Sequence, residues 1–185
     1  PKPALACFYY GQAEMLKEAF LDAQGSYLKG LNYNRIHYKC LLGLYDLLMQ
    51  RKMYAEAYEV IRRMQKYFPA NPKRLASVIR LAVINHKYSD IEQFYTVFKE
   101  LEFRDDEIVR YMCAGLIVSA QHALGADPKS GRGIELLSQA AVSCAGQPYF
   151  LRRVMEVLSE HRLSEPMASV LSRFTPQAQT ETDYL

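Results

Sequence analysis

The chain has 185 residues, 50% hydrophobic and 23% charged, which is ordinary for a folded soluble protein. Its formal net charge is only +3, so overall charge gives no reason to expect nucleic acid or a membrane surface as the partner. No apolar run approaches the ~18 residues that a membrane-spanning helix needs, and no signal peptide opens the chain. We therefore expect a cytoplasmic protein. Because the sequence begins Pro1-Lys2-Pro3 without an initiator Met, we also expect it to be part of a longer protein.

The start of the chain contains two candidate helices without a recognisable turn between them. Residues 4–14 and 18–28 both have helical character, but residues 15–17 contain no Gly, Pro, Asn or Asp to mark a turn. Gly11 is placed where a first helix would pack closely against its neighbour. We therefore predict an irregular first hairpin from which a loop of several residues is missing, with one continuous long helix as the alternative.

The next segment predicts a regular helical hairpin. Residues 35–50 and 55–67 both carry apolar side chains at the helical period, and the polar residues 51–53 separate them. The second of these helices ends near Pro69, because proline cannot extend a helix. Pro72 then suits the first turn of the helix that follows.

The rest of the chain continues the same alternation. Helices are predicted over residues 73–85, 89 to about 103, 105 to about 124, 134–143, 148–161 and 164–174. The acidic residues 105–107 stand at a helix N-terminus, where the helix dipole favours negative charge. Three glycines and a proline make residues 125–133 a long loop. Residues 175–185 are polar and without periodicity, and we predict that they form a disordered tail.

The helices repeat with a period of 34 residues. Tyr54 and Tyr88, which each precede a second helix, are 34 positions apart. The same spacing joins Leu44 with Val78, Leu48 with Ala82, Ala57 with Ile91, Ile61 with Tyr95, and Met64 with Phe98. This period is the length of two helices and two short turns. Since a lone hairpin cannot bury its apolar face, neighbouring hairpins must stack.

This pattern resembles the tetratricopeptide repeat over about residues 34–145. Most of the family motif is met by Leu44, Tyr54, Ala57, Ile61, Met64 and Pro69. The departures are Tyr45, where the family prefers Gly or Ala, Ile91 in place of Ala, and Phe103 in place of Pro. The fourth repeat, with Gly133, Leu137 and Ala140, is also similar to Sel1-like repeats.

The resemblance implies a fold class and a location for a binding site. The expected fold is all-α, a right-handed α-solenoid of about five antiparallel helical hairpins, which forms one domain over residues 1–174. In this superfamily the first helix of each hairpin lines a concave groove. Asp46 stands where some members carry an Asn that helps to clamp a C-terminal carboxylate, so that particular clamp is not expected here.

The residues that could carry chemistry are scattered. Cys7, Cys40, Cys113 and Cys144 form no CxxC pair and lie in apolar helical segments, so we predict buried, reduced thiols. His37 and Cys40 are three positions apart on one helix, but two ligands make an incomplete zinc site. With no nucleophile and base brought together, we expect neither an enzyme nor a metal or other cofactor.

Charge is the most informative polar feature. Residues 34–80 contain ten Lys and Arg against three Asp and Glu, whereas residues 81–110 contain four against seven. We predict a partner-binding groove from the first-helix positions Lys39, Asp46, Lys73, Ser77, Arg80 and Arg110. Its cations would receive an acidic peptide or a carboxylate.

We therefore expect a scaffold that binds another protein, in the setting of a bacterial regulatory or signalling protein. Two alternatives stay open. One is binding of single-stranded RNA in the manner of pentatricopeptide repeats, which the segment 37–42 resembles. The other is self-association of two copies through exposed aromatic side chains. A protein partner is preferred because one-base-per-repeat RNA readout needs several good repeats in tandem.

Overall fold

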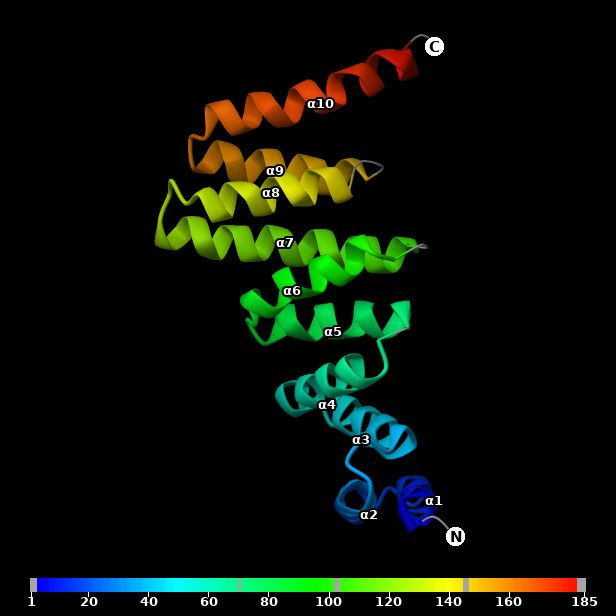
Figure 1. The fold of residues 1–185 in the computed structure, drawn as a ribbon. Coiled ribbons are helices and arrows are strands. Elements are labelled where there is room, and N and C mark those ends of the chain that lie inside the picture. The colour runs from blue at the N-terminus through cyan, green and yellow to red at the C-terminus, as the bar shows by residue number, and fades with distance from the viewer. Residues whose placement is uncertain (1–2, 70, 102–103, 145–146, 183–185) are drawn as a thin grey trace. The chain divides into compact units, whose positions relative to one another are not determined.

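The computed structural model describes residues 3–69, 71–101, 104–144 and 147–182, with side chains as far as Arg173. Over these residues the chain forms ten helices. It divides into two compact units, and the division falls between His86 and Lys87. The first unit contains α1 (Pro3–Leu16), α2 (Phe20–Tyr33), α3 (Tyr38–Gln50), α4 (Tyr54–Tyr67) and α5 (Pro72–Ile84) (Figure 1). The second contains α6 (Tyr88–Lys99), α7 (Asp106–Ala126), α8 (Gly131–Ser143), α9 (Pro148–Glu160) and α10 (Ser164–Thr182).

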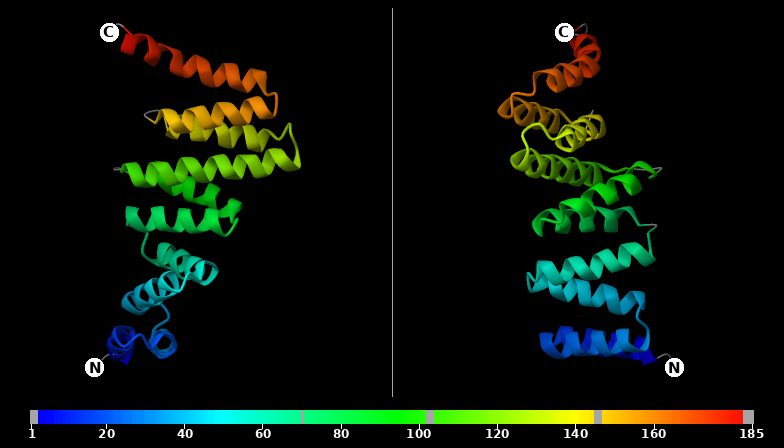
Figure 2. Two further views of the ribbon diagram at one scale, coloured as in Figure 1. Left: turned by 180° about the vertical axis from the view of Figure 1, so that it is seen from behind. Right: turned by 60° about the vertical axis from the view of Figure 1, so that its left-hand side comes forward.

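Within each unit, consecutive helices pack against one another as hairpins (Figure 2). In the first unit α3 packs against both α1 and α2, and α4 then packs against α3 and α5. In the second unit α9 packs against both α7 and α8, and α10 against α8 and α9. Within each unit one hairpin thus packs against the hairpin before it, α3–α4 against α1–α2 and α9–α10 against α7–α8. The predicted fold class, an all-α solenoid of tetratricopeptide-like hairpins, is confirmed.

Four turns between consecutive helices contain a non-glycine residue in the left-handed backbone conformation. These residues are Glu18 (φ 58°), Lys52 (58°), His86 (56°) and Arg162 (56°). At Glu18 the turn is closed by two hydrogen bonds, from the Glu18 N–H to the Met15 carbonyl (3.0 Å) and from the Ala19 N–H to the Glu14 carbonyl (2.9 Å). The same pair of bonds closes the turns at Lys52 and Arg162, so these helices end in Schellman motifs.

The prediction of an irregular first hairpin is wrong. Glu18 lies 34 residues before Lys52, and Lys52 lies 34 before His86, so the first repeat is in register and lacks no loop. A continuous helix is excluded as well, because α1 ends at Leu16 and α2 begins at Phe20. The turn was missed because a charged residue, rather than Gly or Asn, adopts the left-handed conformation.

The second helices bury equivalent positions in successive repeats. Ala57, Ile61 and Met64 of α4 are at most 3% exposed, and the residues 34 positions later on α6 are buried too. The same is true 34 positions earlier on α2, where Ala23 and Tyr27 are fully buried and Gly30 is buried. The 34-residue register predicted for the middle of the chain therefore extends to its first hairpin.

Tyr27 determines how closely α1 and α3 approach α2. Its ring is fully buried, and a Cβ added at Gly11 or at Gly43 would lie only 2.5 or 2.6 Å from the ring atom Cε1. Only glycine fits on either side of the ring at this distance. The side chain of Gln12 donates a hydrogen bond of 2.7 Å to the Tyr27 hydroxyl, which satisfies the polar end of the ring. Tyr27 thus packs between α1 and α3.

Side chains cap the starts of several helices. Asp105 accepts a hydrogen bond from the Ile108 N–H (2.9 Å) at the start of α7, and Asn71 accepts one from the Arg74 N–H (3.2 Å) at the start of α5. All four cysteines are free thiols and buried, as predicted. The helix that was predicted to reach Phe103 ends at Lys99, and Phe103 itself lies outside the described residues.

The sequence predicts a disordered tail from residue 175 to residue 185. The structure carries α10 to Thr182, and residues 183–185 lie outside the described part. The domain boundary at residue 174 stays a prediction. Throughout the described residues, each helix is too short or too polar to cross a bilayer.

The packing of Tyr27 can be tested with glycine substitutions. Gly43→Ala places a methyl group against the Tyr27 ring, and we expect it to lower the free energy of unfolding by about 1–3 kcal/mol. Gly25→Ala in α2 is the control, because its Cβ meets nothing within 4 Å; better helix propensity should then raise stability by up to ~1 kcal/mol. Urea unfolding followed by circular dichroism measures both. Equal stability of the two variants would contradict this packing.

The turn at Lys52 gives a second test. Lys52→Gly removes the steric cost of a left-handed lysine, and we expect a net gain in unfolding free energy of roughly 0.5–1 kcal/mol. Lys66→Gly, at an exposed position in the last turn of α4, should instead lower it by about 1 kcal/mol. Thermal unfolding distinguishes the two, and a loss of stability in Lys52→Gly would refute the left-handed conformation.

Candidate functional site

Five of the six predicted binding residues lie on the first helices of the first unit. Lys39 and Asp46 belong to α3, and Lys73, Ser77 and Arg80 belong to α5. Lys39 and Lys73 are 34 positions apart, as are Asp46 and Arg80, so they occupy equivalent places on successive repeats. All are exposed except Ser77, which is half-buried.

Two aromatic side chains of α1 extend this surface beyond the predicted residues. The Lys39 ammonium lies 5.6 Å from the centre of the Phe8 ring and 5.7 Å from that of Tyr9, which are cation–π distances. Phe8 lies 34 residues before Leu42 of α3 and is its equivalent in the first repeat. We call the surface formed by Phe8, Tyr9, Lys39, Leu42, Asp46, Lys73, Ser77 and Arg80 the first-helix face.

Tyr45 connects α3 with α5 on this surface. Its half-buried side chain forms a hydrogen bond with that of Ser77. Burial is the largest influence on Tyr45 and raises the pKa of its hydroxyl above the usual 10.0. The positive charge of Arg80 also acts on the Tyr45 hydroxyl and lowers its pKa to a smaller extent. The departure from the family motif at Tyr45 therefore adds a link between two repeats.

Asp46 is the one acidic residue of the first-helix face. Desolvation by the side chains around it raises the pKa of its carboxyl above the usual 3.8, although the residue keeps contact with solvent. Among the described residues no ion pair compensates its charge. A negative ligand group is therefore disfavoured next to Asp46 and favoured next to the three cations.

Two of the arginines in the basic segment 34–80 form hydrogen bonds within the fold. Arg74 is buried, donates a hydrogen bond to the Phe68 carbonyl, and places its guanidinium 5.5 Å from the centre of the Tyr38 ring. Arg63 likewise donates to the Arg35 carbonyl. These two arginines hold loops in place, so part of their hydrogen-bonding capacity is used within the fold. In contrast, Lys39, Lys73 and Arg80 form no ion pair among the described residues.

The sixth predicted residue, Arg110, lies on α7 in the second unit. It is exposed, and its Nε donates to the Asp106 carbonyl at 3.2 Å. Its assignment to the same groove stays a prediction.

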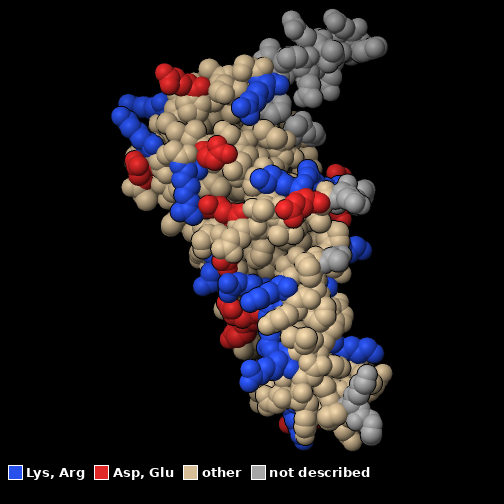
Figure 3. Space-filling model, viewed as in Figure 1, with Lys and Arg blue, Asp and Glu red and all other residues tan. Residues whose placement is uncertain are grey.

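The two units differ in charge. Residues 1–86 contain 13 Lys and Arg against six Asp and Glu, a formal charge of +7, whereas residues 87–185 contain ten against 14, a formal charge of −4. On the face that Figure 3 shows, blue side chains predominate over the part that belongs to the first unit, and both colours mix over the second. The formal net charge of the whole chain, +3, is therefore small although the first unit is basic.

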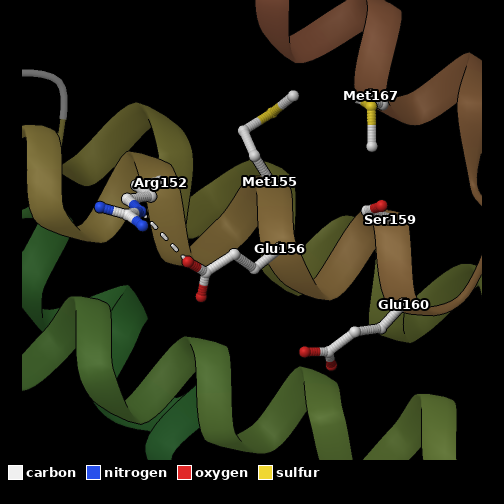
Figure 4. Close-up of a pocket in the computed structure, with 6 residues that line it drawn as sticks. All are labelled: Arg152, Met155, Glu156, Ser159, Glu160 and Met167. Carbon is white, nitrogen blue, oxygen red and sulfur yellow. Dashed lines mark hydrogen bonds and ion pairs between the residues drawn. The ribbon is translucent and has the colours of Figure 1, made fainter.

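A hollow of about 580 Å³ lies between α9 and α10, lined by Arg152, Met155, Glu156, Ser159, Glu160 and Met167 (Figure 4). Its charged groups pair with one another or with Arg153: Arg152 lies 3.2 Å from Glu156, and Arg153 lies 2.9 Å from Glu156 and 3.8 Å from Glu160. Such exposed, mutually compensated pairs leave little charge for a ligand. The first-helix face is therefore the stronger candidate.

The thiols and His37 are arranged for packing. The Nδ1 of His37 accepts a hydrogen bond from the Cys40 N–H (3.3 Å), which caps α3. Burial raises the pKa of the Cys40 thiol to about 11, and its hydrogen bond with Cys144 together with burial raises the pKa of Cys113. Both thiols are therefore protonated at neutral pH. Among the described residues, no three His, Cys, Asp or Glu side chains gather as they would around a metal ion.

The geometry of the chain is similar to that of known helical-repeat structures. A chain of the structure of Naa15/Naa10 bound to HypK-THB aligns over 95% of this chain with a TM-score of 0.60 at 16% sequence identity. The MamA protein aligns over 99% with a TM-score of 0.50 at 10% identity, and over 96% of its own length. The chain has a tetratricopeptide-like fold.

This likeness concerns the fold alone. The chain spans 26% of the length of the chain that it matches in the Naa15/Naa10 structure. No protein-family model and no curated protein sequence matches it. The function must therefore be argued from the chain's own surface.

Proposed function

We propose that this chain is a non-catalytic scaffold that binds another protein through the first-helix face of its first unit. The observation that carries the proposal is that Lys39, Lys73 and Arg80 are exposed on the first helices α3 and α5 without ion-pair partners among the described residues. Lys39 lies beside exposed aromatic surface, with Tyr9 56% exposed. Aromatic side chains and arginine are enriched at protein-binding surfaces.

The proposed partner is an acidic segment of another protein. The first unit carries a formal charge of +7, which would speed the encounter with a negative partner at low ionic strength. The similar fold of Naa15, which occurs in a complex with Naa10 and HypK, supports a scaffold role. A regulatory or signalling role in the cytoplasm belongs to the same proposal and rests on the resemblance of the repeats alone.

Charge reversal on the face should abolish this binding. We expect random-sequence peptides selected on the full chain to be rich in Asp and Glu. The variant K39E/K73E/R80E should bind them at least tenfold more weakly, since three attractive charges become repulsive. The control K29E/R51E/K66E makes the same change in net charge away from the face, on α2, at the end of α3 and on α4. Its affinity for the selected peptides should fall less than threefold. Fluorescence anisotropy at two salt concentrations measures both.

Two results would contradict the proposal. Equal losses in the two triple variants would show that only overall charge matters. Tight, salt-sensitive binding of mixed single-stranded RNA, without binding of any selected peptide, would favour the RNA alternative.

A second candidate function is self-association through the outer side of α1. Ala6, Tyr10 and Ala13 are spaced as one helical stripe and are exposed, Tyr10 by 68%. The residues 34 positions later on α3, Cys40, Leu44 and Leu47, are at most 4% exposed in the repeat that packs on α1 and α2. The positions that are buried on α3 are therefore exposed on the outer side of α1. A second copy of this chain would bury them.

Light scattering across a concentration series tests the second candidate. We expect the apparent mass of the unmodified chain to rise toward a dimer, and Tyr10→Glu to remain monomeric because it places a charge in the interface. Tyr33→Glu, an exposed tyrosine at the end of α2, should behave like the unmodified chain. A strict monomer at all concentrations would remove this function.

A further inference from the structure

The basic charge of the first unit is concentrated in three short segments. Residues 33–38, 62–68 and 71–74 contain no Asp or Glu and six Lys and Arg, which are Arg35, Arg62, Arg63, Lys66, Lys73 and Arg74. The rest of residues 1–86 contains seven Lys and Arg against six Asp and Glu. Nearly all of the formal charge of the first unit therefore comes from these segments.

The three segments lie at one edge of the first unit, where α2 connects to α3 and α4 connects to α5 (Figure 2). Arg63 of α4 donates a hydrogen bond to the Arg35 carbonyl in the first connection. The Tyr38 ring at the start of α3 meets the Phe68 ring of the second connection in a T-shaped contact, with 5.2 Å between the ring centres. We call this surface the connection edge, and it consists of Tyr33, Arg35, Tyr38, Arg62, Arg63, Lys66 and Tyr67.

Three tyrosines stand among these cations. Tyr33 is 58% exposed, Tyr67 is 49% exposed and Tyr38 is 37% exposed. Tyr33 and Tyr67 are the last residues of α2 and α4 and are 34 positions apart, so they are equivalent in successive repeats. The Lys66 ammonium lies 5.9 Å from the centre of the Tyr67 ring. Each ring keeps surface in water that a flat apolar group could cover.

The chain leaves most of this positive charge uncompensated. Arg63 and the buried Arg74 donate to backbone carbonyls, which carry no net charge. Arg62 lies 3.7 Å from Glu59 in a pair whose side chains are about half exposed, and such a pair is weak and screened by salt. Arg35 and Lys66 form no ion pair within the described part of the chain. The connection edge therefore attracts a ligand with several negative charges.

A single-stranded nucleic acid supplies the two groups that match this surface. Its phosphates are negatively charged, and its unpaired bases offer flat faces that stack on aromatic side chains. The bases of a duplex are stacked on one another, so a duplex offers mainly its phosphates and its shape. An acidic peptide segment pairs with cations but brings no regular series of flat rings. The combination of uncompensated cations and exposed tyrosines therefore favours the single strand.

We propose that the connection edge binds single-stranded nucleic acid. Its phosphates lie near Arg35, Arg62 and Lys66, and its bases stack on Tyr33 and Tyr67. Binding tolerates many sequences, because phosphate contacts and stacking do not read the edges of the bases. This mode differs from readout of one base per repeat. The site is separate from the first-helix face and goes beyond the proposed function.

Fluorescence anisotropy with the full chain tests the site. The probes are fluorescein-labelled RNA and DNA single strands of about ten nucleotides. We expect both to bind, and the affinity to fall steeply as salt is added, because counterions are released from the phosphates. The variant R35E/R62E/K66E should bind at least tenfold more weakly. All three side chains are exposed, so the change acts on the surface.

A matched control separates the edge from overall charge. K17E/R51E/K52E makes the same change in net charge in the turns at the opposite ends of these helices, and all three side chains are exposed. Glu18 has the same left-handed conformation as Lys52, so glutamate is acceptable at that position. We expect the affinity of this control for the oligonucleotides to fall less than threefold. Circular dichroism checks that both triple variants keep their helix content.

Substitution of a tyrosine tests base stacking. Tyr67→Ser should weaken binding severalfold, and Tyr67→Phe should leave it unchanged because the ring is kept. Tyr149→Ser on α9 removes a tyrosine that is 73% exposed in the second unit, and it should have no effect. An equal affinity of Tyr67→Ser and the unmodified chain would contradict stacking on this ring.

Three results would overturn the nucleic-acid site. The first is binding of polyglutamate or of a duplex of the same length as tightly as the single strands, which would leave negative charge as the only requirement. The second is an equal loss in the two triple variants. The third is no binding of the single strands at low salt. The selected peptides and K39E/K73E/R80E test the first-helix face separately, because the edge variants leave those three residues unchanged.

Discussion

The ring of Tyr27 between two glycines is the contact on which the geometry of the first unit depends. Gly11 lies on one side and Gly43 on the other, so a single side chain fixes the approach of α1, α2 and α3. Gly30 repeats the arrangement one turn later, where a Cβ would lie 2.5 Å from the Cys40 sulfur. Close packing of large against small residues in this way leaves few alternative arrangements. The positions of Phe8, Tyr9 and Lys39 on the first-helix face follow from it.

The second unit uses the same principle with different residues. There Gly133 at the start of α8 allows the Leu124 side chain of α7 to approach, since a Cβ at Gly133 would lie 2.6 Å from its Cγ. Arg104 donates hydrogen bonds to the Phe98 and Lys99 carbonyls and lies over the Phe98 ring. In the first unit Arg74 likewise donates to the Phe68 carbonyl, but it lies over the Tyr38 ring. Basic side chains near helix ends thus satisfy carbonyls that would otherwise lack partners.

The helices and their 34-residue register could be predicted because periodicity and proline positions are local signals. The turn at Glu18 could not, because its left-handed conformation is imposed by the packing of α1 on α2 and not by a residue that prefers it. This one error had a consequence for the site. Without the register of the first repeat, Phe8 and Tyr9 could not be aligned with Leu42 and Gly43, and the aromatic end of the face was missed. Spacing alone also could not distinguish Arg74, which holds a loop, from Lys73, which faces solvent.

A protein ligand on the first helices of the first unit is the feature on which the proposed function depends. Backbone amide shifts in nuclear magnetic resonance, recorded while a selected peptide is added to the full chain, test it most directly. We expect the largest shifts along α1, α3 and α5, at residues such as Tyr9, Leu42 and Arg80, with small shifts at Lys29 and Lys66. Shifts confined to α2 and α4, or to the hollow between α9 and α10, would contradict it.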